Sequence, residues 1–339
     1  MISNLPVYPW QQRQWERLRA PMAANRLPHA LLLAGPPGLG KAAFARGLTQ
    51  ALLCSAPNEH GACGECKSCL LNAAGNHPDV YLVGLEEDSR VLKVDAVRAL
   101  ANFATLKSQF GGRKVGLIHP ADRMNTNAAN SLLKTLEEPP SGAVIILVAD
   151  RSARLPATVR SRCQRIDFQP PDREMAAVWL GQQADLGQER ADQLMLLANG
   201  APCRAIELAE QGADVACEKL VQQLLQLKAR RASPVEVAAG WGKDTHGLLL
   251  DLLIVTVQSL IRQESGAEAL HPAGQALDRL RGKLDVLALH EYLDFLYSMN
   301  ALTDRALNPQ LYAEDLFLRW SDACRPSLAH GCRSYPQTD

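Results

Sequence analysis

The chain has 339 residues, of which 47% are hydrophobic and 21% charged, and its formal net charge is zero. This composition is typical of a soluble globular protein, and the length favours two or three domains. There is no apolar stretch of transmembrane length, and no basic head followed by an apolar core at the N-terminus, which predicts a cytoplasmic protein without a membrane partner.

Five short apolar runs alternate with helical patterns in the first half of the chain. The runs are nearly continuous rather than alternating, which is typical of parallel strands buried on both faces. Between two of them, apolar residues of Asn127–Glu138 recur at helical spacing, and Pro139-Pro140 ends the pattern. We therefore predict a doubly wound α/β domain over residues 1–168. The five predicted strands are 29–34, 79–84, 114–119, 144–149 and 165–168.

The first apolar run leads into Gly35-Pro-Pro-Gly-Leu-Gly-Lys41-Ala42, and a helical pattern follows. This order matches the strand–GxxxxGK–helix context of a phosphate-binding loop, or P-loop. The glycines let backbone N–H groups turn toward phosphate oxygens, and the lysine supplies a charge for the outer phosphates. The alternative is a glycine-rich turn that does not bind phosphate. The candidate phosphate-binding residues are Gly35, Gly38, Gly40 and Lys41.

Four cysteines cluster in the pattern Cys54-x8-Cys63-x2-Cys66-x2-Cys69. Thiolates at this spacing can close a tetrahedron round Zn²⁺, and Gly61 and Gly64 permit the tight turns that this requires. Four thiolates leave no open coordination position, so the predicted zinc is structural. A redox dithiol, an iron–sulfur cluster and unliganded cysteines are the alternatives. His60 and His77 lie nearby but are not needed as ligands.

The residues that bind magnesium in hydrolytic P-loops are replaced at two places in this sequence. Hydrolytic P-loops place Ser or Thr after the lysine to hold Mg²⁺, whereas this chain has Ala42. A neighbouring strand normally ends in carboxylates, whereas the run 115–118 is followed by His119 and Pro120. Asp122 lies too far beyond the strand end in this register. We expect no Mg²⁺ and no hydrolysis, while binding of ATP or ADP stays open.

The character of the sequence changes after Gln169-Pro170-Pro171. Leu, Ala and Gln dominate at helical spacing, and no further strand is predicted. A break near Gln211-Gly212 divides this half into a small helical domain at 169–210 and a helical bundle at 211–328. The residues 329–339 are predicted to be a tail. The longer predicted helices are 221–229, 248–262, 270–283, 286–299 and 311–323.

The net charge of zero conceals an asymmetry along the chain. Residues 1–168 carry 20 Lys and Arg against 13 Asp and Glu, while residues 169–339 carry 16 against 23. A basic first half could favour nucleic acid, and an acidic second half could favour protein partners. Two solvated surfaces that simply differ in charge are an equal alternative.

These motifs together resemble bacterial clamp-loader subunits of the AAA+ superfamily. The resemblance is specific over about residues 25–170 and weaker, though consistent in architecture, to about 325. It rests on the P-loop, the four-cysteine insertion after its helix, the segment NSLLKTLEEPP at 130–140, the segment NHPD at 76–79, and Ser161-Arg162-Cys163.

The resemblance implies a role for Arg162. In the family, the arginine of Ser-Arg-Cys reaches across a subunit interface to the γ-phosphate held by the neighbour, which makes Arg162 the candidate catalytic residue, acting in trans. Alternatively, Arg160, Arg162 and Arg165 are solvated or ion-paired. The family's Gly-Ser-x-Arg lid segment is altered here to Gly200-Ala-Pro-Cys-Arg204, with its arginine one residue late.

The family further implies a fold and partners. Its members combine an AAA+ α/β domain with a helical lid and a C-terminal collar. The degenerate site points to the family member that does not hydrolyse ATP. This member is part of the DNA polymerase III holoenzyme and has no ATPase activity by itself. The implied partners are gamma/tau and delta in a hetero-pentamer, which loads the sliding clamp onto primed DNA.

The sequence leaves two other functions as alternatives. The first is an autonomous AAA+ ATPase that tolerates Ala42. The second is a zinc-dependent DNA-binding module, which is weakened because the cysteine segment contains only Lys67 and His60 as basic residues and no aromatic residue.

Overall fold

The computed structural model describes residues 7–86, 89–242, 245–267, 271–281, 284–302 and 308–324. The chain forms two compact units. Unit 1 holds the residues through Asp172 together with Ala201–Arg204, and unit 2 holds Arg173–Gly200 and the residues from Ala205 onward. The separation of a 169–210 domain from a 211–328 bundle stays a prediction. The predicted tail at 329–339 lies outside the described residues.

Unit 1 is built on a parallel five-stranded sheet in the order β2-β3-β4-β1-β5, as the sequence predicted for an α/β domain. The three inner strands are buried along their whole length, which explains their uninterrupted apolar runs. The edge strands are partly exposed. The strands are β1 (Ala30–Ala34), β2 (Val80–Val83), β3 (Lys114–Ile118), β4 (Ala143–Ala149) and β5 (Gln164–Asp167).

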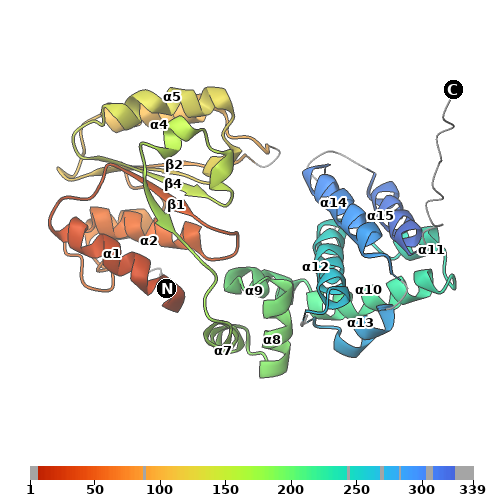
Figure 1. Ribbon diagram of the computed structural model, residues 1–339. Coiled ribbons are helices and arrows are strands. Elements are labelled where there is room, and N and C mark those ends of the chain that lie inside the picture. Colours follow the sequence, from red (N-terminus) through yellow and green to blue (C-terminus); the bar gives the residue numbers. More distant parts are fainter. Residues whose placement is uncertain are drawn as a thin grey trace, which may run out of the picture. The chain divides into compact units, whose positions relative to one another are not determined.

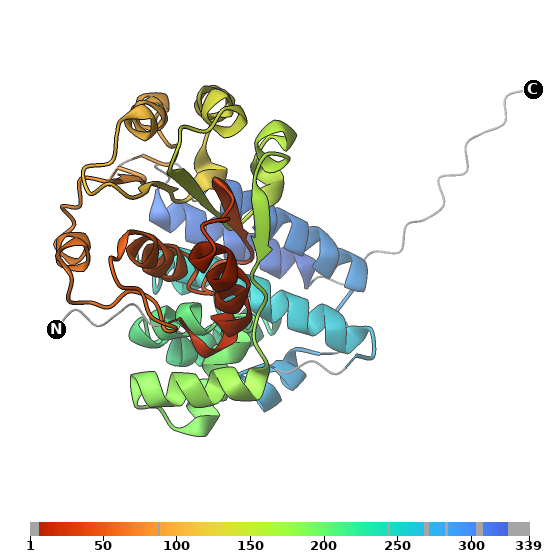
Figure 2. The same ribbon diagram turned by 90° about the vertical axis from the view of Figure 1, so that its left-hand side faces the viewer.

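Helices cover both faces of this sheet (Figures 1 and 2). On one face, α4 (Val94–Thr105) and α5 (Thr126–Glu137) pack into a core with side chains of β3 and β4. On the other, α1 (Gln12–Ala23) and α2 (Lys41–Leu53) pack against β1 and β4. Two short helices, α3 (Lys67–Ala73) and α6 (Ala157–Arg160), lie in the connections. The helices therefore shield both faces of the sheet from solvent, as is usual for parallel strands.

Helix α5 shows how local sequence sets the element boundaries. Asn125 begins the helix by accepting a hydrogen bond from the Ala128 N–H (2.8 Å). Its apolar stripe, including Leu132 and Leu136, is buried against the sheet. The helix ends at Glu137, just before the Pro139-Pro140 pair that was predicted to end it.

Unit 2 is helical throughout its described residues, and one continuous apolar core runs through it. Within that core α8 packs against α10, and α12 against α14. The helix expected over 270–283 begins only at Gly274, after Pro272. The helices are α7 (Arg173–Ala184), α8 (Gln188–Leu197), α9 (Pro202–Glu210), α10 (Ala213–Lys228), α11 (Pro234–Ala238), α12 (His246–Glu264), α13 (Gly274–Leu280), α14 (Val286–Leu302) and α15 (Pro309–Ala323).

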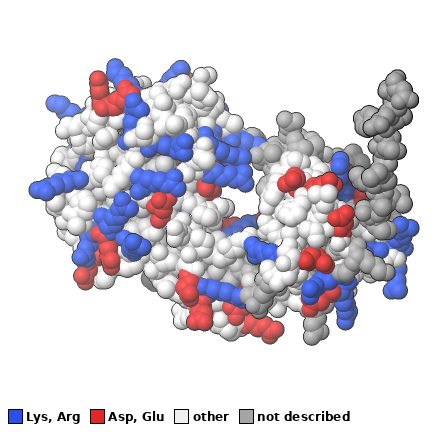
Figure 3. Space-filling model, viewed as in Figure 1, with Lys and Arg blue, Asp and Glu red and all other residues white. Residues whose placement is uncertain are grey.

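None of the helices in the described ranges combines the length and the apolarity that crossing a bilayer requires. On the face drawn in Figure 3, lysine and arginine side chains are more prominent than acidic ones over unit 1. This view agrees with the excess of basic residues before position 168.

A histidine is buried in the core of unit 2 as the neutral imidazole. His271 is 7% exposed, and its Nδ1 accepts the Ala273 N–H (3.1 Å). The Thr256 hydroxyl donates to the Leu252 carbonyl, which leaves its oxygen to accept from His271 Nε2 at 3.2 Å. The Cys217 thiol lies 3.9 Å from the same nitrogen. Burial lowers the pKa of His271 to about 4.

Acid should therefore destabilise unit 2. Because the folded pKa is below the ordinary value, the unfolded chain binds the extra proton, and stability falls as pH drops from about 6.5 toward 4. Between pH 7 and pH 5 we expect His271 to account for about 2 kcal/mol of lost unfolding free energy. Urea unfolding at the two pH values measures it. The same pH dependence in His271→Gln would contradict the prediction.

Candidate functional site

The P-loop lies between the end of β1 and the start of α2. Gly40, at φ 76°, is the N-cap of α2, so the loop presents the positive end of a helix dipole. Gly38, at φ 75°, also needs the freedom of glycine, because a Cβ there would lie 2.5 Å from the Cβ of Arg204. The predicted phosphate-binding residues are thus gathered in a backbone cradle at a helix N-terminus.

Lys41 does not point into open solvent. Its side chain is 3% exposed, and its ammonium lies 2.7 Å from a carboxylate oxygen of Asp150. The same ammonium donates a hydrogen bond to the Pro36 carbonyl of the loop. Asp150 directly follows β4, the strand that pairs with β1 in the sheet. The lysine predicted to hold phosphates is therefore paired with an acid of its own chain.

The N-terminal segment and the start of α9 pack against the P-loop. Trp10 Nε1 and Gln11 Nε2 both donate to the Leu39 carbonyl, at 3.1 and 2.8 Å. The Tyr8 ring lies against Gly40, and the Cys203 N–H donates to the Gly38 carbonyl (3.0 Å). Burial, with a further contribution from Cys203, raises the pKa of Tyr8 to about 12.

This packing places the altered lid segment, Ala201–Arg204, against the loop. The segment belongs to unit 1 although the helix that it begins continues into unit 2. The backbone N–H of Cys203 is the group of this segment that donates to the Gly38 carbonyl. Sequence reasoning expected a departure from the family pattern here, and the role of Arg204 stays untested.

The positions after β3 hold no carboxylate, as the sequence indicated. His119 follows the strand, and burial lowers its pKa, so the imidazole is neutral near pH 7. The Asp122 carboxylate accepts the N–H groups of Asp150 (3.3 Å) and Arg151 (3.0 Å). Asp122 therefore has a structural use, which is to hold the chain that leaves β4.

Arg162 lies just after α6, at the surface of unit 1. One guanidinium nitrogen is 2.6 Å from a carboxylate oxygen of Glu137, the last residue of α5, and another donates to the Thr158 carbonyl (2.9 Å). The Arg162 side chain remains 34% exposed. In the single chain this arginine is thus ion-paired, yet it stays within reach of solvent.

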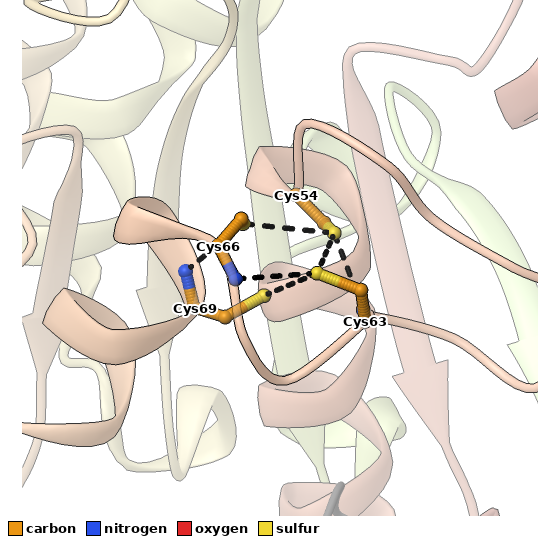
Figure 4. Close-up of side chains that lie close together, drawn as sticks. All are labelled: Cys54, Cys63, Cys66 and Cys69. Carbon is orange, nitrogen blue, oxygen red and sulfur yellow. Dashed lines mark hydrogen bonds between the residues drawn. The ribbon is translucent and has the colours of Figure 1, made fainter.

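The four clustered cysteines converge on one point (Figure 4). Cys54 follows the end of α2, Cys63 lies in the connecting loop, and Cys66 and Cys69 come from the start of α3. Their sulfur atoms all lie within 4.8 Å of one another, and the nearest pairs are 3.5 to 3.9 Å apart. Four Zn–S bonds of about 2.3 Å in a tetrahedron place the sulfurs about 3.8 Å apart. The donor set and its spacing fit zinc.

Backbone groups prepare this cluster for negative charge. The N–H groups of Cys63, Cys66 and Cys69 each point at the sulfur of the preceding cysteine in the cluster, at 3.3 to 3.5 Å. Burial by itself would raise the pKa of the Cys66 thiol, but hydrogen bonds with Ser55 and the Cys69 N–H lower it to about 5. Hydrogen bonds with the backbone of Glu65 and Cys66 also lower the pKa of Cys63, whereas burial raises the pKa of Cys54 and Cys69. A thiolate is the form that binds a metal.

Neither nearby histidine joins the four sulfurs. His60 is exposed beside Glu59. His77 is buried, accepts the Asp79 N–H (3.0 Å) and is hydrogen-bonded to Ser68 (2.7 Å). Asp79 is fully buried and accepts the Ser108 hydroxyl and two backbone N–H groups of the following loop. The NHPD segment therefore ties the cysteine module to the α/β fold.

Sequence reasoning missed Asp150 because it sought carboxylates only after the run 115–118. A signal was available, since Asp150 directly follows the apolar run 144–149. The carboxyl ends of parallel strands meet at one edge of a sheet, where ligands bind.

The chain is similar in sequence to known proteins. Residues 10–172 match a family model described as DNA polymerase III, delta subunit. The DNA polymerase III subunit delta′ of Pseudomonas aeruginosa is 35% identical over 330 residues, which cover 94% of this chain and 99% of that protein. The subunit delta′ of Escherichia coli K12 is 38% identical over 217 residues, or 64% of this chain and 65% of that one.

A solved structure also matches this chain. It is described as a DNA polymerase III gamma subunit-related protein from Thermotoga maritima, and the match covers 92% of this chain and 100% of that chain. The two are 18% identical, with a TM-score of 0.45.

Proposed function

Because the chain belongs to the DNA polymerase III delta′ family, we propose that it acts in the replicative clamp loader as a non-hydrolysing subunit. In this role it assembles with gamma/tau and delta into a hetero-pentamer in the cytoplasm. The complex loads the sliding clamp onto primed DNA. The residues 211–328 would serve as its part of the collar.

The observation that carries the non-hydrolysing assignment is the state of the nucleotide site. Ala42 offers no hydroxyl, and His119 and Pro120 stand where a hydrolytic site needs carboxylates. The fold brings the Asp150 carboxylate to Lys41, and the lysine already neutralises it. Positions 42, 119 and 120 therefore supply no side-chain oxygen for Mg²⁺, which supports the proposal.

The proposal assigns the chemistry of this chain to Arg162, which would complete the ATP site of a neighbouring gamma/tau subunit. A guanidinium there stabilises the charge that develops during phosphoryl transfer. Its exposure and its location at the end of a short helix support the assignment. The four cysteines, Cys54, Cys63, Cys66 and Cys69, would hold a structural zinc.

Purified alone, the chain is expected to hydrolyse no ATP, whereas mixing it with gamma/tau and delta should give one complex with DNA-stimulated ATPase activity. Size-exclusion chromatography and a phosphate-release assay measure the two properties. Turnover by the chain alone that Lys41→Ala abolishes would support an autonomous ATPase instead. Failure to assemble with gamma/tau and delta would overturn the clamp-loader assignment.

A further inference from the structure

We infer that Asp150 is an internal counter-ion of the P-loop, which takes the place of a nucleotide phosphate and lowers the affinity of the loop for phosphates. The inference goes beyond the loss of hydrolysis, because that loss concerns magnesium and water rather than binding. It concerns unit 1 alone and does not depend on assembly with other subunits.

The first support is the burial of the lysine. With 3% of its side chain exposed, Lys41 needs an anion or several acceptors nearby, because an unpaired buried ammonium is strongly unfavourable. Asp150 supplies the anion at 2.7 Å, and the Pro36 carbonyl supplies a further acceptor. In a nucleotide-bound P-loop, the phosphate supplies that negative charge. In this chain Asp150 supplies it.

The second support is that Asp150 is held in place. It directly follows β4, whose last residue, Ala149, is in register with Ala34 at the end of β1. Its backbone N–H, and that of Arg151, donate to the Asp122 carboxylate. A phosphate that approached Lys41 would therefore meet a carboxylate on an anchored backbone, and it would either displace the lysine from Asp150 or lie beside a like charge.

The third support is the balance of charge round the site. The groups that act electrostatically on His119 are the cations Lys41 and Arg46 and the carboxylates Asp150 and Asp122. These two positive and two negative charges cancel, and burial keeps His119 neutral near pH 7. The two carboxylates therefore weaken the positive field that Lys41 and Arg46 would present to a polyphosphate, although the dipole of α2 remains.

The cradle itself is otherwise retained, which makes the inference testable. Gly38 and Gly40 keep the left-handed conformation that turns the loop, and α2 begins directly after it at Lys41. Removing only the charge of Asp150 should leave a loop with its backbone donors and a lysine available to phosphate. Asn has nearly the shape of Asp, so Asp150→Asn changes little else.

The test is titration of the full chain with ADP, without Mg²⁺, by isothermal titration calorimetry. We expect Asp150→Asn to bind ADP up to about fivefold more tightly than the unchanged chain, the size of effect that one partly exposed ion pair can supply. Adding Lys41→Ala to this variant should remove the gain. Inorganic phosphate, as a second probe, should show a gain of the same sign.

Asp95→Asn is the matched control. It removes the same charge from an exposed position on α4, which packs on the opposite face of the sheet from α2. Equal ADP affinity of the unchanged chain and Asp150→Asn would overturn the inference, and so would an equal gain in Asp95→Asn.

Because Asp150→Asn leaves Lys41 without its partner, its melting temperature should fall and then recover when ADP is added. If that variant does not fold, Asp150→Ser carries the same comparison with a smaller neutral side chain. A lower melting temperature without any gain in ADP affinity would mean that the pair only stabilises the fold, and would overturn the inference.

Discussion

Replacing Arg162 with Ala should lower ATP hydrolysis at the neighbouring gamma/tau site of the reconstituted complex by about 10³-fold or more, the range of well-studied trans-acting arginines. The loss arises because the guanidinium stabilises charge that develops only in the transition state. Single-turnover hydrolysis in the presence of primed DNA and the clamp measures it. Assembly of the complex should survive, since the Arg162 side chain is partly exposed and lies outside the cores of unit 1.

The ion pair with Glu137 does not prevent this role. An exposed pair of this kind contributes at most about 1 kcal/mol, so a γ-phosphate across an interface can replace Glu137 at small cost. Glu137→Gln should accordingly leave hydrolysis by the complex nearly unchanged. Arg162→Lys should restore only part of the activity, because an ammonium lacks the planar fork of donors that matches phosphate oxygens.

Arg160 provides the matched control. It is exposed, is the last residue of α6, lies two residues before Arg162, and carries the same charge. Arg160→Ala should therefore change the surface charge equally while leaving hydrolysis in place. Equal losses in the two Ala variants, or no loss in Arg162→Ala, would show that Arg162 does not act on the neighbouring nucleotide.

Loss of the predicted zinc should have the second large effect, and it should fall on stability rather than on chemistry. Structural zinc contributes about 10–16 kcal/mol of apparent binding free energy in zinc-finger peptides near pH 7. The cysteine segment contains only the short helix α3, and it is fastened to the fold by Trp15 Nε1 donating to the Glu59 carbonyl (3.0 Å) and by the Ser68–His77 hydrogen bond. Without metal, the segment 54–69 should open and become sensitive to proteases.

Metal analysis of the purified chain should give one zinc per chain, and Cys66→Ser should lose it. Cys163→Ser is the control, since that cysteine is partly buried but lies outside the four-sulfur cluster. Limited proteolysis followed by mass spectrometry should place new cleavage within residues 54–69 of Cys66→Ser only. Absence of zinc from the unchanged chain would refute the site. A complex that still hydrolyses ATP after all four cysteines are changed to Ser would support a purely structural metal.

The local elements of unit 1 could be predicted from sequence because each is encoded by neighbouring residues. The apolar runs of β1, β3 and β4 are buried along their whole length, as continuous hydrophobic segments between helical patterns predict. The P-loop glycines and the Cys54–Cys69 spacing are likewise short-range patterns. Their geometry follows from backbone conformation over a few residues.

What the sequence could not determine depends on the order of the strands and on long-range packing. Lys41 and Asp150 are 109 positions apart in the sequence, and they meet only because β4 pairs with β1 in the sheet. Continuous apolar runs predict burial but carry no information about which strands are neighbours. The same holds for Arg162, whose contact with Glu137 requires α6 to pack beside the end of α5.

The P-loop shows most clearly which features follow from the sequence and which require the tertiary structure. The sequence by itself determined the glycines of the loop, Lys41, and the presence of Ala42, His119 and Pro120 where hydrolytic sites have a hydroxyl and carboxylates. Only the tertiary structure brought Tyr8 and Cys203 against the loop and placed Asp150 on the lysine. The physical reason is that a buried charge must find its partner wherever the folded chain places one, and that partner need not be close in sequence.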